Sequence, residues 1–230
     1  MGFWSAILDA LFPPTCEVCG RALAEGEEMM CMECQAKMPR VWHHRTPRTA
    51  LSMRLTGIGK IIKVASYYHF VRHDAYAKLI QNAKYNNRPE IDRWLARRFA
   101  SELQAEGFFN GIDCLIPVPL HRWKLVKRGF NQSQEIAEEI SDVTGLPVCL
   151  NLYASKGHKT QTHKNADQRQ KNVEGVFRLD HSEDLEGKHV LLIDDVITTG
   201  STLLACCAAI RAVQPNVAFS VLSLASTTAI

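Results

Sequence analysis

Runs of apolar residues along the chain alternate with stretches in which apolar and polar residues recur at helical spacing. The apolar, β-branched or aromatic runs predict strands over residues 61–71, 112–119, 148–152, 175–179, 190–193 and 217–225. Helical spacing predicts helices over residues 74–85, 89–104, 134–143 and 203–213. The run from Val190 to Ile193 has no polar residue, which is typical of a strand buried on both faces of a parallel sheet. The pattern therefore predicts an α/β fold in which helices flank a parallel sheet.

Residues suited to binding a phosphate follow this apolar run. Two adjacent carboxylates, Asp194 and Asp195, end the predicted strand, and before the next predicted helix come Thr198, Thr199, Gly200, Ser201 and Thr202. A helix N-terminus carries unpaired N–H groups and partial positive charge, and glycine lets the backbone approach an anion closely. The carboxylates suit ribose hydroxyls or a hard cation such as Mg²⁺. Ser and Thr are also ordinary helix caps, but a cap alone does not explain paired acids at the end of an apolar strand.

Four of the eight cysteines have the spacing of a metal site. They form two Cys-x-x-Cys pairs, Cys16 with Cys19 and Cys31 with Cys34. Two such pairs supply the four thiolates of a structural zinc ribbon, and a closed site of this kind leaves no position for a reacting water. We therefore expect Zn²⁺ to support folding and not catalysis, with two redox disulfides as the alternative. A ribbon can dock nucleic acid or protein, and the sequence does not choose between them.

The composition is that of a globular protein long enough for one α/β domain and a small appendage. Residues 1–14 predict a short amphipathic helix whose polar side has no basic residue, so we expect it to pack on the protein and not on a membrane. No apolar run approaches the ~20 residues needed to span a bilayer. Because the start also lacks the features of a secretory signal, we expect a cytoplasmic protein without stable membrane insertion.

Basic residues gather in two segments before the phosphate-binding stretch. Residues 120–134 hold four basic and no acidic side chains, and residues 152–172 hold five basic and one acidic. In the first segment Arg128, Gly129 and Asn131 precede a predicted helix, where basic groups suit a pyrophosphate or a nucleic-acid backbone. A solvated basic turn is the alternative there. Residues 153–172 of the second segment form a long polar stretch, so we interpret them as a lid that closes over a polyanion.

Residues 190–202 resemble the phosphoribosyl pyrophosphate (PRPP) motif of type I phosphoribosyltransferases, in which two acids and a Thr-Thr-Gly-x-Thr loop follow an apolar run. The chain also has the four-cysteine ribbon, Pro-Val-Pro-Leu at 117–120 and Arg-Gly-Phe-Asn-Gln at 128–132. In this combination it resembles the ComF family of competence-associated proteins, and most of all the GntX-type branch, which is associated with gluconate and DNA utilisation. The resemblance implies a type I phosphoribosyltransferase-like domain with a small N-terminal zinc ribbon.

The same resemblance implies roles for individual residues. Asp194 and Asp195 would hold ribose and Mg²⁺, residues 198–202 the 5′-phosphate, and Arg128, Gly129 and Asn131 would lie near the pyrophosphate. Arg169 would lie in a mobile loop and, with the two aspartates, take part in catalysis. The chain departs from the family at residues 158–161, where His-Lys-Thr-Gln stands in place of the frequent Arg-Thr-x-x-Gln start of that loop.

The expected organisation is an N-terminal helix at 1–14, the ribbon at 15–40, a linker at 41–60 with His43 and His44 in a solvated loop, and the phosphoribosyltransferase-like domain at 61–230. We favour a PRPP-binding protein that acts in DNA utilisation, competence or gluconate uptake. Its expected partners are PRPP or another phosphorylated ribose, DNA through the ribbon and basic segments, and DNA-uptake machinery. The alternative is an active Mg²⁺-dependent phosphoribosyltransferase, whose amine or base acceptor the sequence does not identify.

Overall fold

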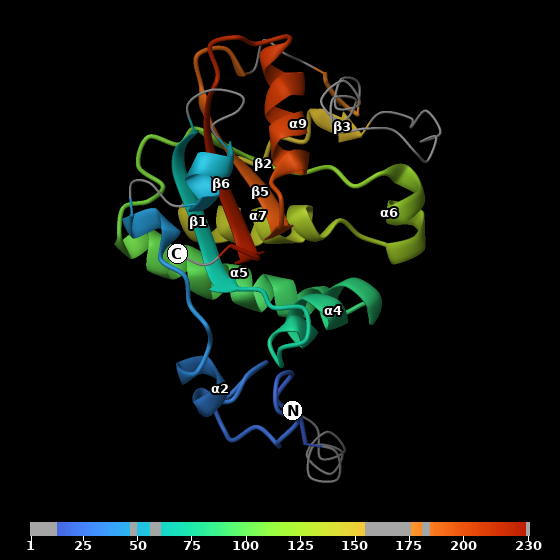
Figure 1. Cartoon of the computed structure of the whole chain (residues 1–230). Coiled ribbons are helices and arrows are strands. Elements are labelled where there is room, and N and C mark those ends of the chain that lie inside the picture. Colours follow the sequence, from blue (N-terminus) through green and yellow to red (C-terminus); the bar gives the residue numbers. More distant parts are fainter. Residues whose placement is uncertain (1–12, 47–49, 56–60, 155–175, 181–184, 229–230) are drawn as a thin grey trace.

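The computed structural model describes residues 13–46, 50–55, 61–154, 176–180 and 185–228. At its centre lies a parallel sheet whose strand order is β1 (Ile61–His69), β6 (Ala218–Ser226), β5 (His189–Ile197) and β2 (Cys114–Pro117) (Figure 1). β3 (Leu152–Ala154) and β4 (Phe177–Leu179) form a separate antiparallel pair. The predicted parallel sheet is therefore confirmed, with β5 paired on both sides.

Helices cover the sheet and extend beyond it. The longer ones are α4 (Ala77–Tyr85), α5 (Pro89–Ala105), α7 (Gln132–Thr144) and α9 (Ser201–Arg211). Shorter helical segments are α2 (Met32–Ala36), the 3₁₀ helix η1 (His43–Arg45), α3 (Ala50–Arg54) and α6 (Arg122–Arg128). Pro89 starts α5 at a position where its missing N–H costs nothing. Two arginines of α5 pair with two glutamates of α7, Arg93 with Glu135 and Arg97 with Glu139, so the two helices are joined by charge as well as by packing.

The two faces of the sheet bury different sets of side chains. Leu191 and Ile193 of β5 belong to a cluster with apolar residues of α4, α5 and α7, whereas Val190 and Leu192 belong to a second cluster with those of α3 and α9. This division follows the period of two along a strand. All four of these side chains are fully buried, as the unbroken apolar run predicts.

The cysteine-rich segment shares its core with the sheet. Val18, Met30 and Met38 belong to the same apolar cluster as Phe99 of α5 and Leu222 of β6. Figure 1 shows this segment, with α2, beside α4 and α5 and remote from α9. Tyr76, the residue before α4, donates a hydrogen bond of 2.8 Å to the carbonyl oxygen of Cys34. The ribbon is thus built against α4 and contributes to one continuous core.

The chain between ribbon and sheet is more buried than expected, and the expectation of solvated histidines is wrong. His43 is 2 % exposed, and the side chain of His44 is packed with its Nε2 3.1 Å from Glu106 Oε2, so neither lies in a solvated loop. Leu51 and Leu55, within the segment interpreted as a linker, are fully buried under the sheet in the second cluster. Apolar residues spaced four apart give this short segment a buried stripe. No helix among the described residues has the length and apolar character needed to cross a bilayer.

Candidate functional site

The acid pair lies inside β5 and not after its end, because the pairing with β6 continues through Asp194 to Ile197. The strand therefore continues to Ile197 and does not end in the two acids as the sequence predicts, although the acids do lie near the carboxyl edge of the sheet. The two carboxylates contact different helices, since Asp194 meets α7 and Asp195 meets α4. Asp194 accepts a hydrogen bond of 3.2 Å from Ser133 Oγ, and Asp195 Oδ2 lies 2.7 Å from Lys84 Nζ.

The electrostatics of the two acids differ. Burial, followed by the nearby charge of Asp195, raises the pKa of Asp194 to about 7. Its hydrogen bonds with Ser133 and with the Asp195 amide both use Oδ1 and oppose that rise. Asp195 is 8 % exposed and has a salt bridge with Lys84. One carboxyl therefore changes charge near neutral pH while the other is held against a cation.

A third acid lies behind the pair. Asp92 of α5 is 1 % exposed, and within the described part of the chain neither of its oxygens has a hydrogen-bond partner. Burial, followed by the charge of Asp195, raises the pKa of Asp92 well above its ordinary value, and Lys84 opposes the rise. Lys84 thus faces a group of three carboxyls in which full ionisation would be costly.

The loop at residues 198–202 leads from β5 into α9. Gly200 has φ +78° and directly precedes α9, and the Ser201 amide at the start of that helix donates a long hydrogen bond of 3.4 Å to Thr199 Oγ1. Thr199 Oγ1 and Ser201 Oγ are 2.9 Å apart, and both residues are exposed, as are Thr198 and Thr202. The loop therefore presents exposed hydroxyls beside the N–H groups of a helix start, which is the chemistry that binds a phosphate.

The second predicted anion position lies where α6 turns into α7. Gly129, with φ +84°, ends α6, and Asn131 caps α7 by accepting a hydrogen bond of 3.2 Å from the amide of Ser133. Arg128 Nη1 donates to Gln132 Oε1 at 3.0 Å, while Gln132 Nε2 is buried without a partner in the described ranges. Since Ser133 also reaches Asp194, the structure brings this turn and the acid pair together.

A groove of about 650 Å³ lies beside the turn. It is lined by four basic side chains and no acidic one, together with Tyr85, Asn87, Trp123, Val126 and Gly129; the basic residues are Lys84, Lys124, Lys127 and Arg128. The Arg128 guanidinium lies 5.7 Å from the centre of the Tyr85 ring, so α4 and α6 form opposite walls. The groove is therefore strongly cationic, and it lies next to the acid pair because Lys84 both lines the groove and pairs with Asp195.

Sequence reasoning missed Lys84, Asp92 and Ser133. Lys84 and Asp92 are charged residues within otherwise amphipathic helices, and nothing in the local pattern distinguishes them from solvated side chains. Ser133 carried one signal, because it follows the Arg-Gly-Phe-Asn segment at a helix start. Arg169 and most of the predicted lid at 153–172 lie outside the described residues, as does most of the N-terminal helix.

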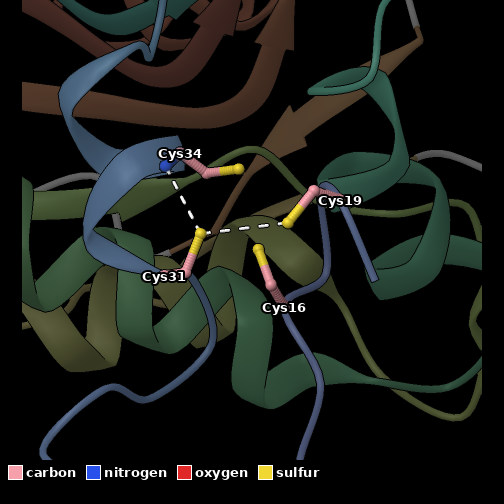
Figure 2. Close-up of side chains that lie close together, drawn as sticks. All are labelled: Cys16, Cys19, Cys31 and Cys34. Carbon is pink, nitrogen blue, oxygen red and sulfur yellow. Dashed lines mark hydrogen bonds between the residues drawn. The ribbon is translucent and has the colours of Figure 1, made fainter. Parts of the chain in front are cut away.

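The four predicted zinc ligands converge. Figure 2 shows the side chains of Cys16, Cys19, Cys31 and Cys34 pointing toward one centre, and their sulfur atoms all lie within 4.8 Å of one another. Sulfur atoms of a tetrahedral Zn²⁺ site are about 3.8 Å apart, so these positions fit the ion. Burial acts to raise the pKa of Cys16, but hydrogen bonds from backbone amides outweigh it and lower that pKa to about 6. Four converging thiols with backbone hydrogen bonds to a ligand sulfur are typical of a structural zinc ribbon.

Comparisons with known proteins agree with this structure. Residues 95–228 match a family model described as phosphoribosyl transferase domain, and residues 7–53 match one described as double zinc ribbon domain. Because the first match covers more than half of the chain, the chain belongs to the phosphoribosyl transferase domain family. A structural zinc site in the N-terminal ribbon is supported by the second match and by the four cysteines.

Its relatives carry competence and DNA-utilisation names, which confirms the resemblance to the ComF family. The chain is 34 % identical over 130 residues to Competence protein F of Haemophilus influenzae, covering 54 % of this chain and 57 % of that protein. It is 27 % identical over 192 residues to DNA utilization protein YhgH of Escherichia coli K12, covering 82 % and 80 %. It is 26 % identical over 188 residues to Competence protein ComFC of Bacillus subtilis, covering 82 % and 68 %.

Solved structures give weaker likenesses. A glutamine PRPP amidotransferase from B. subtilis aligns with a TM-score of 0.38 and 20 % identity over 57 % of this chain and 26 % of that one. A purine phosphoribosyltransferase from Pyrococcus horikoshii aligns with a TM-score of 0.35 and 16 % identity over 60 % and 87 %. Neither likeness is strong enough to support an argument about this site.

Proposed function

We propose that this chain binds PRPP at the carboxyl edge of its sheet and acts in the use of external DNA, through competence or DNA utilisation. Gluconate uptake is the alternative process. The hydrogen bond from Ser133 to Asp194 carries this proposal. It joins the acid pair of β5, which leads into residues 198–202 (called the phosphate loop below), to the basic turn at residues 128–131 before α7. One site thereby offers groups for a ribose, a 5′-phosphate and a pyrophosphate, which are the parts of PRPP.

The carboxylates fit Mg²⁺ as well as ribose hydroxyls. Asp194 is partly exposed and its described hydrogen bonds leave Oδ2 unused, so an oxygen ligand of the kind Mg²⁺ prefers is present. Mg²⁺ bound there with PRPP would neutralise the pyrophosphate charge. Asp194 and Asp195 would orient the ribose, and Thr198, Thr199, Gly200, Ser201 and Thr202 would hold the 5′-phosphate.

Calorimetric titration of the zinc-loaded chain with PRPP and Mg²⁺ tests the proposal. Asp194→Asn with Asp195→Asn should abolish binding, whereas Asp142→Asn, which removes an exposed acid of α7, should leave it unchanged. Because Asp195→Asn removes the partner of Lys84, the single variant Asp194→Asn with an unchanged melting temperature serves as the second test. A wild-type chain that binds no PRPP would refute the proposal.

The alternative is catalysis at the same site. The acid pair, the loop and the basic turn are all present, which favours an active phosphoribosyltransferase that displaces pyrophosphate with an amine or base nitrogen. Arg169 would be a further catalytic residue in that case. A screen of amines and bases for pyrophosphate release decides this, and a wild-type chain that binds PRPP but releases no pyrophosphate with any of them would favour the binding role.

Direct contact with DNA is the second part of the proposal, and DNA-uptake machinery is the other partner considered. The names of the relatives and three exposed cations of α6, Arg122, Lys124 and Lys127, support it. Affinity for an oligonucleotide should fall steeply with salt, with a log–log slope of about −0.7 per contacted phosphate on a single strand. Lys124→Glu with Lys127→Glu should weaken binding, whereas Lys188→Glu at the opposite end of β5 should not. Binding that does not change with salt would exclude the DNA contact.

A further inference from the structure

Lys84 is the cation that links the acid pair to the basic groove. It lies at the end of α4, outside the residues 95–228 that match the phosphoribosyl transferase model. Its Nζ is 2.7 Å from Asp195 Oδ2, and its side chain is 19 % exposed and also lines the groove with Arg128. A lysine that serves only to neutralise a buried acid has no need to line a cavity.

We propose that Lys84 binds the pyrophosphate of PRPP while remaining paired with Asp195. This deepens the PRPP-binding function and rests on it. An ammonium group donates three hydrogen bonds, and within the described part of the chain Asp195 is the one carboxylate within 4 Å of Lys84 Nζ. Two hydrogens thus remain for oxygens of an anion in the groove.

The geometry selects pyrophosphate from the parts of PRPP. An oxygen bonded to Lys84 Nζ at about 2.8 Å lies no more than about 5.5 Å from Asp195 Oδ2. In PRPP the pyrophosphate is on C1 of the ribose, directly beside the hydroxyl on C2 and on the same face of the ring as the hydroxyls on C2 and C3, whereas the 5′-phosphate is on the other face. A ribose held by the acid pair therefore brings its pyrophosphate, and not its 5′-phosphate, to Lys84.

The surroundings of Lys84 favour the same ligand. The groove is lined by three further cations and no acid, so it favours a compact anion of several charges. On its opposite wall the Arg128 guanidinium faces Tyr85, the neighbour of Lys84. The unpartnered Nε2 of Gln132, whose Oε1 accepts from Arg128, is a buried donor at the same turn. Lys84 and Arg128 would thus hold the pyrophosphate from two sides.

Contacts between the zinc ribbon and α4 hold the helix that carries Lys84. Asn82 donates a hydrogen bond of 2.9 Å to Glu17 of the ribbon, and Tyr76 donates to Cys34. The C-terminal end of the same helix presents Lys84 to β5. The zinc ribbon therefore supports a helix that carries a ligand of the proposed PRPP site.

Binding of three ligands to the full zinc-loaded chain tests this role. Lys84→Met should weaken binding of Mg²⁺-PRPP and of Mg²⁺-pyrophosphate by at least about tenfold, because a charge-assisted hydrogen bond is lost. Ribose 5-phosphate, which lacks the pyrophosphate, should bind within about twofold of wild type, since its groups meet the acid pair and the phosphate loop and not Lys84. Lys78→Met removes an exposed lysine from the same helix and should change none of the three affinities. Lys84→Arg should restore part of the PRPP affinity.

Four other results would overturn the proposal, and each has a different meaning. Equal PRPP affinity in Lys84→Met and Lys78→Met would exclude any contact, and equal losses of PRPP and ribose 5-phosphate would make Lys84 only a positioning residue for Asp195. A loss of oligonucleotide binding without loss of PRPP binding would assign the groove to nucleic acid. If wild type binds no PRPP, the proposed function fails as well. If Lys84→Met does not fold, the double variant Lys84→Met with Asp195→Asn is compared with Asp195→Asn alone. Equal affinities of these two proteins for Mg²⁺-pyrophosphate would refute the contact between Lys84 and pyrophosphate.

Discussion

Gly200 offers a direct test of how the phosphate loop is held. Its φ of +78° is in the left-handed region, where an alanine costs about 1–2 kcal/mol more than glycine. A Cβ there would also lie 2.8 Å from Leu55 Cδ2, and Leu55 is 1 % exposed, so its side chain cannot move into solvent. Overpacking of this kind typically adds about 1–3 kcal/mol. We therefore expect Gly200→Ala to lower the free energy of unfolding by about 2–5 kcal/mol.

Urea unfolding followed by tryptophan fluorescence, with zinc kept saturating, measures this loss. Gly145→Ala is the matched control, because Gly145 has φ +74° and a Cβ there would have no neighbour within 4 Å among the described residues, so it should cost only the backbone strain. In a Leu55→Ala background the cost of Gly200→Ala should fall to that of the control, since the obstructing side chain is gone. Equal losses for Gly200→Ala and Gly145→Ala in the wild-type background would refute the contact between the loop and Leu55.

Three further predictions concern the zinc, the buried acid and the site serine. Atomic emission should find one zinc per chain, and Cys31→Ser should lose it and lower the melting temperature, because the ribbon shares the main core. The pKa of Asp92 is raised in the folded state, so on raising the pH the unfolded chain loses that proton first, and the stability of the wild type falls above about pH 4. The urea midpoint of Asp92→Asn should therefore fall less between pH 4 and 7 than that of the wild type. Midpoints that fall equally with pH in both proteins would contradict the burial of Asp92. Ser133→Ala removes a hydrogen bond that lowers the pKa of Asp194. The pH at which PRPP affinity reaches half its maximum should therefore move upward, as calorimetry from pH 6 to 8.5 would show. An unshifted pH profile would exclude an effect of Ser133 on the ionisation of Asp194.

The features that the sequence predicts are those set by local pattern. Val190 to Ile193 indicated burial on both faces because four consecutive apolar side chains must alternate between two cores, and the structure confirms both. The two Cys-x-x-Cys pairs indicated a ribbon because the spacing within each pair is local and the ion brings the pairs together. In both cases the information lies within a few residues.

The parts that could not be predicted depend on contacts between distant segments. Lys84 meets Asp195, which is more than a hundred positions away, and nothing in the helical pattern of α4 shows which helix end faces β5. Leu55 lies under Gly200 for the same reason. His43 was expected in solvent because paired histidines in a basic stretch are usually solvated, and its burial follows only from packing of the 3₁₀ helix against β1.

The shared core has a consequence for dividing this protein into parts. A fragment cut after residue 60 would keep all the strands of the sheet, but it would expose the apolar faces of α4 and α5 on which Val18, Met30 and Met38 lie. Such a fragment should aggregate even where its remaining sequence is intact. For the same reason a ribbon from a relative could be exchanged only together with α4, since Asn82 and Tyr76 would otherwise face a surface that does not fit them. The practical unit for fusion or transplantation therefore begins with the ribbon and includes the whole sheet.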